Sequence, residues 1–193
     1  MASFVLASTS PRRHALLRQA GYAFEAVDPG EDGPSSAATP EGRVLDHARH
    51  KARAGQAQRP GRVLLASDTL VWCAGQVLPK PSDRADAERM LRLLADRAHE
   101  VWTGVCVLDA QGEEHAQAAV AEVRFGSIPE DGLQEYLAGE EWTDKAGSYA
   151  IQGTAGAWCE LVRGDYDTVV GLPLGLVGEL LAAAGACSDP SNG

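Results

Sequence analysis

The chain has 193 residues, of which 45% are hydrophobic, and a formal net charge of −10 at pH 7. This length and apolar content are enough to bury a sizeable core. The acidic balance argues against a protein that coats nucleic acid or an anionic membrane, because both need a basic surface. An anionic small substrate is still compatible, provided that positive charge is concentrated at one site.

Cysteine usage and the N-terminus favour a reducing compartment. The four cysteines are widely spaced and form no Cys-x-x-Cys pair. No basic segment followed by an apolar stretch opens the chain, and no run approaches the length of a membrane span. We therefore expect a cytoplasmic protein without a membrane partner. We expect a single domain over residues 1–186 and a flexible tail over 187–193.

The first pattern in the chain predicts a strand, a turn and a helix. "SFVLAS" is a short apolar run, and Ser10 and Pro11 suit the N-cap and the first helical position. Arg12 and Arg13 then fall in the first turn, where each cation opposes the helix dipole by about 0.3–1 kcal/mol. Either they point into water or pair with acidic neighbours, or an anion such as phosphate lies among them.

A second helix is expected over about residues 40–56, after a Pro-, Gly- and Ser-rich loop over 27–42. Thr39 suits its N-cap. Its apolar stripe includes Val44, and Lys51 lies almost in line with Val44, seven residues later. Such a lysine either extends off the edge of the core or reaches into a pocket.

The rest of the chain alternates strands and helices, with antiparallel pairs inserted. We expect a strand over 63–72 that turns back at 73–76, a helix over 84–94, an antiparallel pair over 99–109 and 115–126, a helix over 129–139, a strand over 157–164 and a helix over 173–185. This order favours an α/β domain with a mixed sheet.

Several polar residues stand in positions that suit chemistry. Asp68 lies within the apolar run 63–72, where a charge must be paired, solvated by a cleft or bound to metal. Alternatively, the strand ends at Ser67 and Asp68 lies in a turn. Lys80, between two prolines, is either stiffly presented or an ordinary solvent lysine. Gln152 ends a segment that suits close approach of a ligand or forms an irregular loop.

Standard motifs give little guidance. The five histidines show no metal-ligand spacing, and we expect His47 and His50 to face solvent. There is no P-loop, no dinucleotide-binding fingerprint and no serine hydrolase elbow. Several cations, together with the Asp68 carboxylate in an apolar run, nevertheless indicate a metal-assisted site for a phosphorylated small molecule in this acidic chain.

Five blocks, in order between Phe4 and Leu174, resemble the Maf family of nucleoside triphosphate pyrophosphatases. They are "LASTSPRRHALLRQAG", "ASDTLVW" with "QVLPKP", "AERMLRLLADRAHEVWTGV", "DKAGSYAIQG" and "GDYDTVVGLPL". The resemblance implies an α/β fold of the Maf and inosine-triphosphatase type, with an elongated mixed central sheet flanked by helices and two lobes with a cleft. The implied activity is hydrolysis between the α and β phosphates to a nucleoside monophosphate and pyrophosphate, with Mg²⁺ or Mn²⁺.

The resemblance also implies roles for individual residues. Asp68 matches the proton acceptor, and we expect it to hold the metal as well. The positions that match substrate-handling residues are Ser8, Arg12, Arg13, Lys51, Lys80 and Gln152. One departure is Gly33, which stands where the family has a glutamate that helps to hold the metal. Glu31 or Asp32 would have to replace it as a metal ligand.

The substrate follows from the same comparison. The "KAGSYAIQG" block is similar to the branch that acts on dTTP and UTP, with CTP or modified nucleotides as further candidates. A homodimer is implied by the resemblance alone, and polymeric nucleic acid is not expected. One alternative is a nucleotide-binding regulator of septum formation and cell division with a weakened catalytic site, which Gly33 favours. A division-associated interaction protein is another, but the sequence identifies no partner surface for it.

Overall fold

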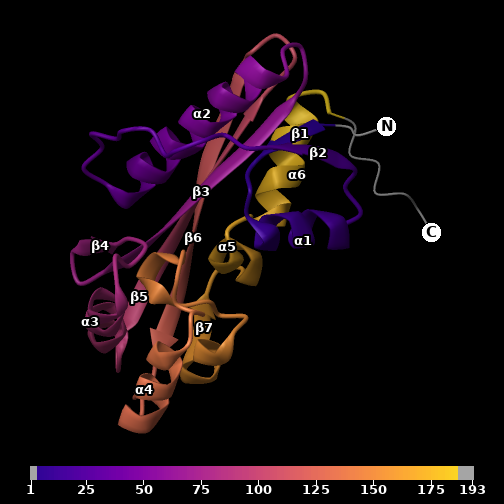
Figure 1. Cartoon of the computed structure of the whole chain (residues 1–193). Helices are drawn as coiled ribbons and strands as arrows, with labels where there is room; N and C mark the ends of the chain where they lie inside the picture. The colour runs from indigo at the N-terminus through magenta and orange to yellow at the C-terminus, as the bar shows by residue number, and fades with distance from the viewer. Residues whose placement is uncertain (1–3, 187–193) are drawn as a thin grey trace. The chain divides into compact units, whose positions relative to one another are not determined.

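The computed structural model describes residues 4–186, so the expected tail over 187–193 lies outside the described residues. The strands are β1 (Phe4–Ala7), β2 (Phe24–Val27), β3 (Leu64–Cys73), β4 (Gln76–Leu78), β5 (Ala98–Leu108), β6 (Glu114–Phe125) and β7 (Cys159–Arg163). The helices are α1 (Pro11–Gln19), α2 (Pro40–Gln58), α3 (Arg84–Leu94), α4 (Glu130–Ala138), α5 (Tyr166–Val170) and α6 (Leu174–Ala183). Figure 1 shows these elements.

The expected α/β fold with a mixed sheet is confirmed. Seven strands form the sheet, in the order β2-β1-β3-β5-β6-β7, and β4 pairs with β3 off this path. β1 is parallel to β2 and to β3, whereas β3 and β4, and β6 and β7, are antiparallel. No helix within residues 4–186 is long and apolar enough to cross a membrane.

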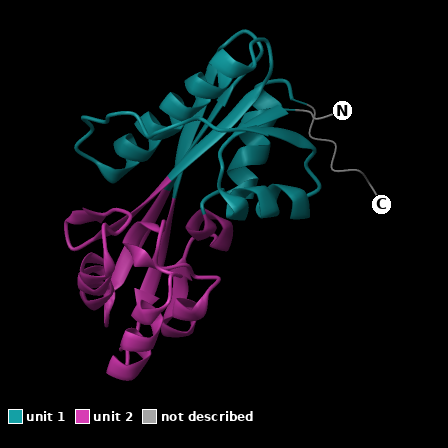
Figure 2. Ribbon diagram, viewed as in Figure 1, with its two compact units in different colours: residues 1–68, 103–119, 171–193 teal, residues 69–102, 120–170 magenta. Residues whose placement is uncertain are grey.

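The chain divides into two compact units, which Figure 2 shows in teal and magenta. Unit 1 comprises residues 1–68, 103–119 and 171–193, and unit 2 comprises 69–102 and 120–170. Each unit has its own core. β3, β5 and β6 contribute residues to both units.

In unit 1, α2 lies on one face of the strands, and α1 and α6 lie on the other (Figure 1). Glycines allow α2 to approach closely. A Cβ on Gly104 of β5 would lie 2.5 Å from the carbonyl oxygen of Val44, and one on Gly55 would lie 2.8 Å from the Cβ of Ala7. The core beneath α2 consists of Val5, Ala7, Val27, Ala48, Ala52, Leu64, Ala66, Cys106 and Leu108. This packing fixes α2 against β3.

In unit 2, α3 covers the core with the apolar face that its sequence predicts. Its buried residues are Ala87, Met90, Leu91 and Leu94. They pack with residues that include Val71, Val101, Phe125, Leu133 and Tyr149. Burial of such side chains, at about 25 cal/mol per Å² of apolar area, is the main source of stability here.

One of the two predicted helix caps is confirmed, and two short elements were not predicted. Thr39 caps α2, because its Oγ1 accepts a hydrogen bond from Gly42 N at 3.2 Å. Ser10 is the N-cap residue of α1, but its side chain makes no capping hydrogen bond. Its backbone N instead donates to Ser8 Oγ at 3.2 Å. β2 and α5 were not predicted: a glutamate interrupts β2 (FEAV), unlike the wholly apolar β1 (FVLA), and the five residues of α5 are too few to show a helical period.

Candidate active site

Asp68 lies inside a continuous strand. β3 runs unbroken from Leu64 to Cys73, so the alternative that the strand ends at Ser67 is wrong. The carboxylate is buried, with only 8% of the residue exposed. A charge at such a position needs partners within the fold.

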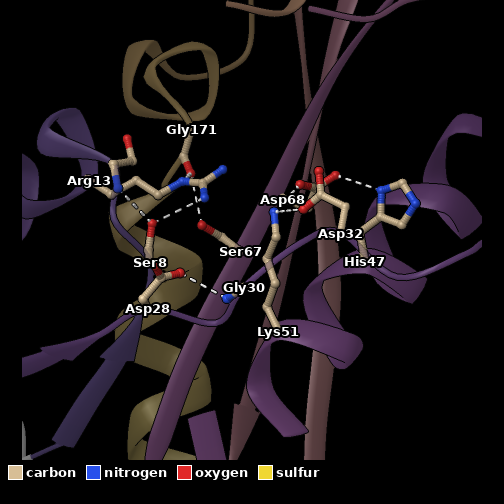
Figure 3. A network of polar contacts seen from close by, with 11 residues as sticks. Ser8, Arg13, Asp28, Gly30, Asp32, His47, Lys51, Ser67, Asp68 and Gly171 are labelled. Atoms are coloured by element: carbon tan, nitrogen blue, oxygen red, sulfur yellow. Dashed lines mark hydrogen bonds and ion pairs between the residues drawn. The ribbon is translucent and has the colours of Figure 1, made fainter. Parts of the chain in front are cut away.

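Lys51 on α2 is one of these partners (Figure 3). Its Nζ donates to Asp68 Oδ1 at 2.6 Å and forms an ion pair with Asp32 Oδ1, also at 2.6 Å. The residue is 8% exposed. Lys51 therefore does not extend off the edge of the core into water, but reaches inward to carboxylates. A single ammonium group bridges two carboxylates.

His47 is the other partner, and the expectation that it faces solvent is wrong. Its Nδ1 lies 3.0 Å from Asp68 Oδ2. His47 precedes Lys51 by four residues, so both side chains project from the same face of α2 toward β3. This i, i+4 spacing indicates a shared helix face in the sequence, but it does not identify Asp68 as the partner of His47. His50 is exposed, as expected.

These contacts keep Asp68 ionised. Burial acts to raise the pKa of its carboxyl group, but the hydrogen bond from His47 and the charge of Lys51 outweigh burial and lower the pKa to about 2. The same hydrogen bond raises the pKa of His47. The site thus holds a fixed negative charge at neutral pH.

A second group of contacts surrounds the start of α1. Arg13 Nε donates to the carbonyl oxygen of Gly171 at 2.9 Å, and its guanidinium also contacts Ser8 Oγ at 3.5 Å. Ser67 Oγ donates to the same Gly171 oxygen at 3.1 Å. Gly171 has a φ of 114°, a conformation that favours glycine. The carbonyl of Gly171 thus orients Arg13, a role that no sequence motif had indicated.

The guanidinium of Arg13 does not point freely into water. Burial lowers its pKa, although an arginine remains protonated in proteins. Arg12, the next residue toward the N-terminus, is half-buried. Two cations therefore lie at the N-terminal end of α1, where backbone N–H groups already favour an anion.

The remaining predicted residues lie in different places. Asp32 reaches Lys51 with a half-exposed side chain, whereas Glu31 is exposed. Gly33 is buried, and a Cβ there would overlap the His50 ring. Lys80 and Gln152 belong to unit 2 and are exposed. Unit 1 thus brings together Ser8, Arg13, Asp32, Lys51 and Asp68.

The donor set fits a hard divalent cation that keeps water and substrate ligands. Asp32 and Asp68 each place an oxygen 2.6 Å from the same Lys51 nitrogen, so the two carboxylates converge. Mg²⁺ is usually bound by one or two carboxylates together with phosphate oxygens and water. Among the described residues, no group of three or more His, Cys, Asp or Glu side chains could hold a metal ion. Substrate and water would therefore have to complete the coordination.

The fold and this geometry define a class of protein. It is an α/β protein in which an ionised carboxylate and a lysine lie in the same unit as arginines at a helix N-terminus, an arrangement suited to a phosphorylated ligand. The family model described as "Maf-like protein" matches residues 3–184. The chain therefore belongs to the Maf family.

Proteins named dTTP/UTP pyrophosphatase are among its relatives. One from Vibrio vulnificus is 43% identical over 183 residues, which cover 94% of this chain and 98% of that protein. Another from Pyrococcus abyssi is 42% identical, covering 92% of this chain and 94% of the other, and one from Anaeromyxobacter dehalogenans is 46% identical, covering 94% and 93%. Among solved structures, a nucleoside-triphosphatase (dITP/XTP pyrophosphatase) from Mycobacterium abscessus aligns with a TM-score of 0.46 and 19% identity, over 93% of this chain and 92% of that one.

Proposed function

We propose that this protein is a nucleoside triphosphate pyrophosphatase that hydrolyses dTTP and UTP between the α and β phosphates. The products are the nucleoside monophosphate and pyrophosphate. The observation that carries the proposal is the buried, ionised Asp68, held by two donors from α2. The names and high coverage of the relatives support the choice of reaction and of pyrimidine substrates.

Cations in the chain would neutralise the triphosphate. Arg12 and Arg13 lie at the start of α1, and Lys51 reaches the carboxylates. Neutralising the charge of the transferring group and of the leaving pyrophosphate is the dominant contribution to catalysis of phosphoryl transfer. By the family resemblance, Ser8 and Lys80 would contact the phosphates and Gln152 the base.

Asp68 would act as an anionic anchor and proton acceptor. With a pKa of about 2, its carboxylate alone is a weak base toward water. A bound Mg²⁺ or Mn²⁺ would lower the pKa of the attacking water. Asp68 would orient that water and accept its proton, and Asp32 would supply the second carboxylate, with Glu31 as the further candidate.

Product analysis tests this proposal. The purified protein is incubated with dTTP, UTP, CTP, GTP and methylated analogues, with Mg²⁺ or Mn²⁺, and the products are quantified. We expect equal amounts of monophosphate and pyrophosphate, formed fastest from dTTP and UTP. Release of a nucleoside diphosphate and orthophosphate would contradict cleavage between the α and β phosphates.

A second candidate function is a nucleotide-binding regulator of septum formation with a weakened catalytic site. Gly33 favours it, because by the family resemblance this glycine replaces a carboxylate that helps to hold the metal. This candidate predicts nucleotide binding without turnover. Titration calorimetry with dTTP, run beside the product analysis, separates the two functions.

A further inference from the structure

Two donors from one face of α2 hold the two oxygens of the Asp68 carboxylate separately (Figure 3). Lys51 Nζ lies 2.6 Å from Oδ1, and His47 Nδ1 lies 3.0 Å from Oδ2. An ionised carboxylate can only accept hydrogen bonds, so His47 must carry its proton on Nδ1 and donate it. The contact therefore fixes both the tautomer of the histidine and one oxygen of the aspartate.

A single donor would leave the carboxylate free to turn. The final torsion of an aspartate is broad, since it joins a tetrahedral carbon to a planar group. With Lys51 alone on Oδ1, Oδ2 could rotate out of the orientation that a reacting water needs. Donors on both oxygens define the plane of the carboxylate, and β3 fixes its backbone.

The two donors are not equivalent. Lys51 divides its charge between Asp68 and Asp32. In the proposed function, on which this inference rests, Lys51 also neutralises phosphate oxygens and so is drawn toward the substrate. We propose that His47 is a positioning residue that holds Oδ2 of Asp68 and keeps the carboxylate plane aligned while Lys51 serves the nucleotide.

The test compares two substitutions of the same residue. His47→Leu removes the donor while retaining bulk, whereas His47→Asn retains an N–H group at nearly the position of Nδ1, because both nitrogens are bonded to Cγ. His115→Leu is the matched control, since His115 lies half-buried on β6 and outside the network of Figure 3. Thermal unfolding of each variant confirms that it is folded.

Steady-state hydrolysis of dTTP with saturating Mg²⁺ supplies kcat and KM. We expect His47→Leu to lower kcat by about tenfold to a hundredfold, the usual effect of losing a residue that orients a functional carboxylate. KM should change little, because His47 does not contact the nucleotide in this proposal. His47→Asn should recover most of kcat, and the His115 control should match the wild type.

A double-mutant cycle separates positioning from a general structural effect. Without a carboxylate at position 68, there is nothing for His47 to align. In the Asp68→Asn background, His47→Leu should therefore change kcat no further. Multiplicative effects of the two substitutions would overturn the inference, and so would an unchanged kcat in His47→Leu alone. A wild-type protein that hydrolyses no nucleotide would overturn the proposed function, and with it this inference.

Discussion

Each unit contains a buried polar residue whose pKa is lowered. At neutral pH one of these residues is charged and the other is uncharged. In unit 1, Asp68 has a pKa of about 2 and is ionised at neutral pH. In unit 2, His99 has a pKa of about 4 and is neutral at the same pH. Lowering the pKa favours the charged form of an acid and the uncharged form of a base.

The causes also differ. His99 is 3% exposed and lies against the rings of Phe125 and Tyr149, with centroid distances of 5.8 and 5.4 Å. Its Nε2 lies 2.7 Å from the Tyr149 hydroxyl, and burial alone lowers its pKa. At Asp68 burial acts in the opposite direction, and aimed donors overcome it. A buried charge thus requires several charged or donating partners, whereas the buried neutral His99 is held by ring packing and one hydrogen-bond contact with Tyr149.

Removing the shared cation should break the unit 1 arrangement most severely. In Lys51→Met, Asp68 retains only His47 among these two donors. Removal of one partner of a buried ion pair costs about 3–5 kcal/mol, and we expect that loss in the free energy of unfolding at pH 7. Urea denaturation measures it. Lys80→Met, which alters an exposed lysine, is the control, and an equal loss in both variants would contradict the account.

Mild acid should destabilise the protein through His99. The pKa of His99 is about 4 in the folded chain and 6.5 by default, so between these values the unfolded chain binds a proton that the folded chain does not. The free energy of unfolding should therefore fall by about 3 kcal/mol as the pH drops from 6.5 to 4. His99→Phe should lose this part of the pH dependence in urea titrations. An unchanged slope would show that His99 is not kept neutral.

Stronger acid should act through Asp68. Its pKa is lowered from 3.8 to about 2, so its contribution to stability is complete above pH 3.8 and is lost as the pH falls toward 2. The expected loss is about 2 kcal/mol. Denaturation of the wild type and of Asp68→Asn at pH 5 and pH 2 checks this, since the variant should lack this loss. Parallel curves for the two proteins would refute it.

The smallest expected effect concerns the loop beside the carboxylates. In Gly33→Glu the new Cβ would overlap the His50 ring, and we expect a loss of about 1 kcal/mol from overpacking. His50→Ala should relieve the overlap, so the double variant should be more stable than Gly33→Glu. Titration with Mn²⁺ should then show tighter binding to the double variant than to the wild type. Strictly additive stability changes would argue against the overlap.

The sequence predicted the fold well wherever a pattern was long. The α3 face, the Thr39 cap and the turn from β3 to β4 were predicted from periodicity and turn chemistry. The carboxylate of Asp68 stood out because it interrupts an apolar run. His47 was misassigned because a histidine on a helix face gives no hint of a partner that lies 21 residues away in the chain.

The rest of the site depends on contacts that are distant in sequence. Gly171 orients Arg13 through a carbonyl oxygen, 158 residues along the chain, and a backbone group leaves no signature in the sequence. The approach of α2 to β3 depends on Gly104, whose role becomes visible only when the helix is packed. The family resemblance implies roles for residues that local patterns did not single out, and these roles stay predictions.

The most direct test of the central claim is turnover of dTTP by Asp68→Asn. Its kcat is measured with saturating Mg²⁺, and nucleotide affinity is measured by calorimetry on the same preparation. The account predicts that kcat falls by a factor of about 10²–10⁴, because the ionised acceptor is lost. The variant should still bind dTTP. A variant with the turnover of the wild type would remove Asp68 from the mechanism and contradict the account.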